Sequence, residues 1–143
     1  MGKVRAAAGV AGAWVITMQV SCFSAGRLTE GTEPRPYPYD APIVRTLDVQ
    51  IFRDASHIEL VNHTTESLAD FDLWLNERYL RHVDALPPGG SLTLSLYEFL
   101  DEYQEPFRGG GIWSTELPEP IVKAEVQTAE GLVGLISIPE RRR

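Results

Sequence analysis

Apolar and polar residues alternate along several short stretches of the chain from residue 43 onward. In the stretch TLDVQIF, the apolar residues Leu47, Val49 and Ile51 alternate with polar ones, and the same period of two recurs in SHIELVN, DFDLWLN and SLTLSL. Such alternation places every second side chain on one face, as in a half-buried β-strand. Further on, VKAEVQT alternates and LVGLISI is apolar nearly throughout. We therefore predict an all-β domain over residues 43–139.

Residues that favour turns separate these stretches, among them the Pro-Pro-Gly-Gly run at 87–90 and the three glycines at 109–111. Roughly six to eight short strands in one domain are typical of two antiparallel sheets packed face to face. We expect a single antiparallel β-sandwich, broadly immunoglobulin-like, with one short helical turn at 96–103. Because the chain has one cysteine, apolar inner faces rather than a disulfide must hold this domain together.

The alternation also predicts which side chains point away from the core. If the faces that carry Leu47, Val49 and Leu73 point inward, then Phe52 and Trp74 point outward, because side chains alternate along a strand. An outward tryptophan with apolar neighbours is a candidate surface for a partner protein. The alternative, which we weigh equally, is that a bulge or the preceding segment covers these side chains.

One predicted strand carries a candidate ligand site. Asp70 and Asp72 share a face of this strand, and two carboxylates in this arrangement are able to join a calcium site. A sugar ring stacked on Trp74 beside them is the other ligand that this set would suit. A solvated strand face explains the aspartates more simply, since strands of such sheets turn polar residues outward. We retain Phe52, Asp70, Asp72 and Trp74 as a candidate binding surface, without a metal site.

Motifs that carry catalysis are lacking in this sequence. None of His57, His63 and His82 stands at metal-ligand spacing from another histidine or a cysteine. The chain has no G-x-S-x-G elbow, and its triple glycine is not followed by the Lys-Ser/Thr of a phosphate-binding loop. We therefore expect neither an enzyme nor a cofactor.

Three short motifs add a family resemblance. The stretches VNHT at 61–64, FDLW at 71–74 and LPPGGS at 86–91 resemble the bacterial FxLYD-type domain. That family places an Asn-containing strand end before a Phe-x-Leu-aromatic strand, which a Leu-x-Pro-Gly turn follows. The resemblance implies an extracytoplasmic β-sandwich, often behind a lipoprotein signal, with no assigned catalysis. It covers roughly residues 58–96 and leaves the ligand unspecified.

The first 26 residues differ in composition from the rest of the chain. They hold two basic residues and no acidic one, whereas residues 27–143 hold 11 basic and 20 acidic residues. The basic start is followed by an uncharged, mainly apolar stretch over 6–20 and then by small residues. This order is typical of a secretory signal, and the apolar stretch is short of the ~20 residues that a membrane-spanning helix needs.

The stretch QVSC resembles the lipobox of bacterial lipoproteins. The resemblance implies a signal peptide over 1–21 and lipid attachment to Cys22, which becomes the new N-terminus. In this sequence Gln19 stands three positions before the cysteine, where the family usually has Leu. Phe23 follows the cysteine instead of an acidic residue, which in lipoproteins of double-membrane bacteria points to the outer membrane. In the alternative, a general signal peptidase cuts after Gly26 and releases a periplasmic or secreted protein.

A lone cysteine in an exported protein is unable to form an internal disulfide, so lipid attachment would give Cys22 a use. Each buried CH₂ of an acyl chain contributes about 0.8 kcal/mol, and two or more chains anchor a protein stably. The segment 22–42 continues with four prolines, which prevent a helix and favour an extended spacer. At the other end, residues 140–143 form a short basic tail.

The chain as a whole is acidic, with a net charge of −7 and a pI of about 4.9. This balance argues against a nucleic-acid partner, which requires clustered cations. The sequence therefore predicts a lipid-anchored extracytoplasmic interaction or structural module of the bacterial cell envelope. Its expected partners are the membrane, through the N-terminal lipid, and an envelope protein. The alternative is a secreted accessory domain that binds sugar or calcium through Asp70, Asp72 and Trp74.

Overall fold

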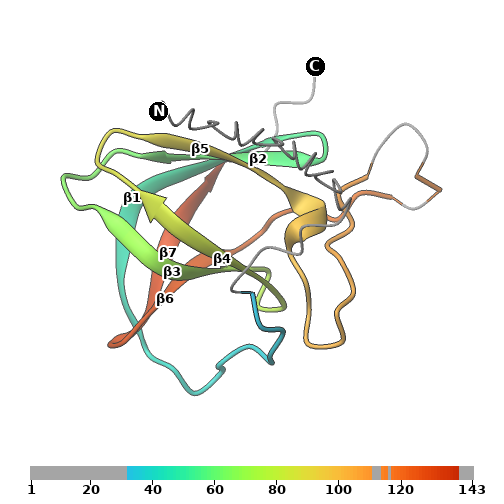
Figure 1. Cartoon of the computed structure of the whole chain (residues 1–143), viewed down its shortest axis with the longest axis horizontal. Helices are drawn as coiled ribbons and strands as arrows, with labels where there is room; N and C mark the ends of the chain where they lie inside the picture. The colour runs from blue at the N-terminus through green and yellow to red at the C-terminus, as the bar shows by residue number, and fades with distance from the viewer. Residues whose placement is uncertain (1–31, 111–113, 116, 139–143) are drawn as a thin grey trace, which may run out of the picture.

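The structure, a computed structural model, describes residues 32–110, 114–115 and 117–138. The predicted signal peptide, Cys22, the first part of the linker and the basic tail lie outside the described residues. Within them, seven strands and one 3-10 turn make an all-β domain, which confirms the predicted class (Figure 1). In chain order the elements are β1 (Ile43–Asp54), β2 (His57–Asn62), β3 (Leu68–Leu75), β4 (Tyr79–Leu86), β5 (Ser91–Ser95), η1 (Leu96–Glu98), β6 (Ala124–Thr128) and β7 (Gly131–Ile138).

The seven strands form one continuous sheet in the order β4-β3-β6-β7-β1-β2-β5. All neighbouring pairs are antiparallel except β1 and β7, which are parallel. The sheet is therefore mixed and curls until it is nearly closed, so the purely antiparallel arrangement of the prediction is corrected. The register of the parallel pair shifts twice, between Ile43 and Arg45 and between Thr46 and Gln50. In Figure 1, β1 runs between β2 on one side and β7 on the other.

The core forms where the predicted apolar faces meet. On β1, β2 and β3 the side chains that the alternation assigned to the inside are buried, as in the case of Val49, Ile58, Leu73 and Leu75, each at 0% exposure. Burying a side chain of this size contributes about 1.5–3 kcal/mol, and the apolar residues of all seven strands add to the same effect. The predicted helical turn is shorter than expected: it comprises η1 alone, and Ser95 makes no side-chain cap hydrogen bond.

Asn62 at the end of β2 ties together two of the motifs that resemble the FxLYD-type domain. Its side chain is fully buried and donates to the carbonyl oxygens of Glu66 (2.8 Å), Leu86 and Pro87 (both 3.2 Å). Its Oδ1 accepts from the backbone N–H and the hydroxyl of Thr64, at 2.9 and 2.7 Å. One amide thus satisfies the backbone of the loop after β2 and of the turn after β4, because buried polar groups need partners.

The linker residues 32–42 pack on the outer face of the sheet. The buried ring of Tyr37 forms a second apolar cluster with Trp74 of β3, Leu80 of β4 and Leu132 of β7. The chain enters this face without helix or strand, as the prolines predict. This part of the predicted linker therefore belongs to the domain and does not stand away from it as a spacer would.

Candidate functional site

The predicted surface residues lie on the sheet, but they do not form an exposed patch. Trp74 points outward from β3, as predicted, yet it is completely buried. The ring of Tyr37 covers Trp74 edge-on at a centroid distance of 5.3 Å. Nε1 of Trp74 donates to Oε1 of Gln127 at 3.0 Å. Of the two alternatives for this residue, the structure therefore supports cover by the preceding segment. Phe52 lies half-buried on β1, which β6 and β7 separate from β3 in the sheet.

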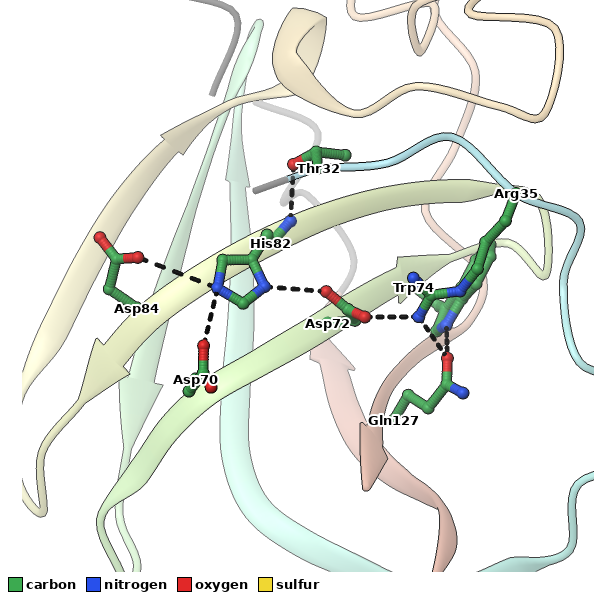
Figure 2. A network of polar contacts seen from close by, with 8 residues as sticks. All are labelled: Thr32, Arg35, Asp70, Asp72, Trp74, His82, Asp84 and Gln127. Atoms are coloured by element: carbon green, nitrogen blue, oxygen red, sulfur yellow. Dashed lines mark hydrogen bonds and ion pairs between the residues drawn. The ribbon is translucent and has the colours of Figure 1, made fainter. Parts of the chain in front are cut away.

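Asp70 and Asp72 join a network centred on His82 of β4 (Figure 2). The Nδ1 atom of His82 lies 2.9 Å from Asp72, and its Nε2 atom lies 3.1 Å from Asp70 and 3.9 Å from Asp84. Arg35 of the linker approaches Asp72 from the other side and donates to Gln127 at 2.9 Å. The network therefore links β3, β4, β6 and the linker through charged groups.

The His82 network favours the ionised form of two of its members. The hydrogen bond with Asp72 raises the pKa of His82; burial opposes this, and the charges of Asp72, Asp70 and Asp84 add to it. Burial acts to raise the pKa of Asp72, but hydrogen bonds from Arg35 and His82 outweigh it and lower the pKa. A protonated His82 between carboxylates is thus the stable arrangement at mildly acidic pH.

Sequence reasoning missed His82, which it treated as an isolated histidine. The signal was present in the pairing of the strands: Asp72 and His82 stand directly opposite each other in the β3–β4 ladder. Opposite charges at facing positions of an antiparallel pair stabilise one another. A register for β3 and β4 would have brought the two residues together.

A second polar cluster fixes the middle of the linker. The hydroxyl of Tyr37 donates to Oε2 of Glu125 at 2.6 Å, and the Glu125 side chain is almost completely buried. Lys123 lies 3.0 Å from Oε1 of Glu125 and 2.5 Å from Oε1 of Glu77. Burial and the bond to Glu125 raise the pKa of Tyr37 to about 12, so its hydroxyl keeps its proton and remains a donor. Two charged clusters and one apolar cluster therefore hold residues 32–42 against the sheet.

Where the docked linker meets the loops, a pocket of about 350 Å³ opens. This volume falls at the lower end of the range of about 300–1,000 Å³ that is usual for ligand sites. Its lining comes from the linker, the β3–β4 turn and the loop after η1. The lining residues are Pro36, Tyr37, Tyr39, Asn76, Glu77, Arg78, Asp101, Glu102 and Tyr103.

The loop after η1 is built around one buried carboxylate. Oδ1 of Asp101 accepts hydrogen bonds from the backbone N–H groups of Tyr103 (2.9 Å) and Glu105 (2.8 Å). Its Oδ2 accepts one from Nη2 of Arg78 at 2.7 Å. Burial acts to raise the pKa of Asp101, but these bonds outweigh it and lower the pKa. The wall that carries Glu102 and Tyr103 is thus fixed by an ionised, satisfied side chain.

The described residues contain no group of three or more His, Cys, Asp or Glu side chains that could hold a metal ion. In the same part of the chain, no helix is long and apolar enough to cross a membrane. The chain matches no family model, no curated protein and no solved structure. The geometry itself offers two networks that hold the linker, and an open pocket beside them.

Proposed function

We propose that this protein is a lipid-anchored binding module of the bacterial cell envelope that carries out no catalysis. The observation that carries the proposal is the stretch TMQVSCFSAG at 17–26, in which the one cysteine of the chain follows an apolar segment with a basic start. Such a segment directs export, and acyl chains on Cys22 would hold the mature protein at a membrane. Phe23 after the cysteine favours the outer membrane.

The docked linker adds a structural argument for a membrane-proximal module. Thr32 lies ten positions after Cys22, and its Oγ1 accepts the backbone N–H of His82 at 2.9 Å. Ten residues span at most about 35 Å when fully extended. An anchored Cys22 would therefore keep the β3–β4 face within that distance of the membrane surface, where envelope partners are found.

We further propose that the domain is an immunoglobulin-like sandwich in which β1 takes part in both layers. The strand order supports this proposal: β1, β2 and β5 are neighbours on one side, and β3, β4, β6 and β7 on the other. These groups correspond to the two sheets of immunoglobulin-type sandwiches, with β4 as an additional strand. Such domains serve many unrelated functions, so the fold leaves the nature of the partner to the site.

The alternative ligand site over Asp70, Asp72 and Trp74 receives no support from the geometry. A sugar needs an accessible ring face for stacking, and Trp74 has none. Asp72 is engaged by Arg35 and His82, which would compete with a calcium ion. We therefore place the binding function elsewhere on this face.

Expression of the full chain in a double-membrane bacterium tests the anchor. The wild-type protein should fractionate with the outer membrane, and Cys22→Ala should appear in the soluble periplasmic fraction. Ser24→Ala serves as the matched control, because it changes a nearby small residue and leaves the cysteine in place. Equal fractionation of the wild type and Cys22→Ala would refute lipid anchoring.

A further inference from the structure

The pocket between the linker and the η1 loop has an unusual balance of hydrogen-bonding groups. Its main donors are already engaged: Arg78 binds Asp101 and Glu105, and the Asn76 amide donates to Glu119 and Pro120. The Asn76 Oδ1 atom is likewise engaged, since it accepts backbone N–H groups of the segment before β6. Two of its acceptors are engaged as well, Asp101 by Arg78 and Glu77 by Lys123. The wall therefore offers a ligand mainly the Glu102 carboxylate and ring faces.

The charge of the lining points the same way. Three carboxylates line the pocket, those of Glu77, Asp101 and Glu102. Lys123 pairs with Glu77 and Arg78 with Asp101, so the charge of Glu102 is the one that remains for a ligand. The charge of the Glu102 carboxylate and its hydrogen bond with the Tyr103 hydroxyl raise the pKa of Tyr103. An excess of negative charge in a concave wall attracts cations and repels anionic ligands.

Tyrosine rings supply the remaining surface. Tyr39 and Tyr103 are about three-quarters exposed, at 75% and 76%, and both line the pocket. Tyr37 lies behind Tyr39, at a ring-centroid distance of 4.9 Å and an interplanar angle of 72°. The faces of aromatic rings attract cations, and rings combined with carboxylates are the usual means by which proteins recognise ammonium groups.

From this composition we infer that the pocket binds a primary alkylammonium group, either on a small free amine or on a lysine side chain of a partner protein. The N–H donors of such a group pair with the Glu102 carboxylate, and its alkyl chain packs on the rings of Tyr39 and Tyr103. The buried Asp101 holds Arg78 and the loop in place, so the wall is formed before the ligand arrives. The inference deepens the proposed binding function, because it names the chemistry that the module recognises.

Titration calorimetry on the full chain in a non-ionic detergent tests the inference, with two amines as probes. The first is 1,5-diaminopentane, and the second is a short peptide with one lysine and blocked ends. We expect saturable binding of at least one probe. Binding of the diamine alone assigns the site to a free amine, and binding of the peptide assigns it to a partner's lysine. The neutral probe 1-pentanol should not bind.

Exposed substitutions separate the pocket from the general acidity of the protein. Glu102→Gln should weaken binding about threefold, and Tyr103→Ala about two- to fivefold, as expected for exposed ion-pair and cation–π contacts. Tyr103→Phe keeps the ring and should retain most of the affinity. Glu130→Gln, which removes an exposed charge from the β6–β7 turn, is the matched control and should bind like the wild type.

Three results would overturn the assignment: absence of saturable binding of both amines, equal binding of 1-pentanol, or equal weakening by Glu130→Gln and Glu102→Gln. None of these results bears on acylation of Cys22, which is determined separately by fractionation. A failure of the ligand assignment is therefore distinguishable from a failure of the anchor.

Discussion

At the scale of single residues, the most informative side chain is the buried amide of Asn62. It satisfies three carbonyl oxygens and two groups of Thr64 without any charge. A buried donor or acceptor that loses its partner costs about 1–3 kcal/mol. One substitution of Asn62 leaves several such groups without a partner. The sequence motif thus has a structural explanation: Asn62 stabilises the fold and does not present a ligand site.

Replacing this amide should destabilise the domain markedly. We expect Asn62→Ala to lower the free energy of unfolding by about 3 kcal/mol, since the carbonyls of Leu86 and Pro87 lose their donor. His63→Ala, at the exposed neighbouring position, should change it by less than about 0.5 kcal/mol. Urea denaturation of the two variants measures both values. Equal effects of the two substitutions would contradict the role that we assign to Asn62.

The His82 network makes stability depend on pH. Because the pKa of His82 is raised, its contribution is complete below the ordinary value of 6.5 and is lost as the pH rises through the folded pKa. Because the pKa of Asp72 is lowered, its contribution is complete above the ordinary value of 3.8 and is lost as the pH falls through the folded pKa. The network therefore stabilises the fold most between these two ordinary values.

Urea denaturation at several pH values should show this dependence. The free energy of unfolding of the wild type should fall as the pH rises from about 6 to 9, and His82→Gln should remove that part of the fall. In an NMR titration, Asp72→Asn should move the pKa of His82 back toward its ordinary value. The substitution removes the charged acceptor Asp72, whose hydrogen bond contributes most to the raised pKa. An unchanged fall in His82→Gln would disprove the role of this network.

At the scale of elements, the linker is the feature that sequence reasoning described least well. Four prolines correctly excluded a helix, but composition does not reveal that one tyrosine in such a segment has a matching surface. That surface consists of Trp74 and Leu80 on the outward faces of their strands, where Tyr37 joins them. An apolar residue on an outward face indicates that something covers it, and alternation alone does not identify the cover.

Truncating the tyrosine should release the linker from the sheet. We expect Tyr37→Ala to lower the free energy of unfolding by about 3 kcal/mol, because it removes a buried ring and leaves Glu125 without its hydroxyl donor. It should also expose Trp74, which would shift its fluorescence to longer wavelength in mature protein that lacks residues 1–21, and with them Trp14, and that carries Trp113→Phe. Tyr39→Ala, at the exposed neighbouring tyrosine, is the control and should leave the emission unchanged. An emission spectrum of Tyr37→Ala at the wild-type wavelength would contradict the packing of the linker on Trp74.

At the scale of the whole molecule, the period of two predicted the strands and the inner face of the sheet well. It did not predict the parallel β1–β7 pair, since alternation is the same in parallel and antiparallel strands. The alternation of VKAEVQT also begins before the strand does: β6 starts at Ala124, and Val122 is 73% exposed. The pocket was not predictable, because Tyr39, Glu77 and Glu102 come from three separate segments that only the fold brings together.

The proposed lipid anchor determines where this whole molecule is held. Mass spectrometry of the intact mature protein, purified from membranes, detects the anchor itself. We expect a chain that begins at Cys22 and carries the added mass of acyl chains on that residue. An unmodified chain that begins at Arg27 would rule out lipid attachment to Cys22.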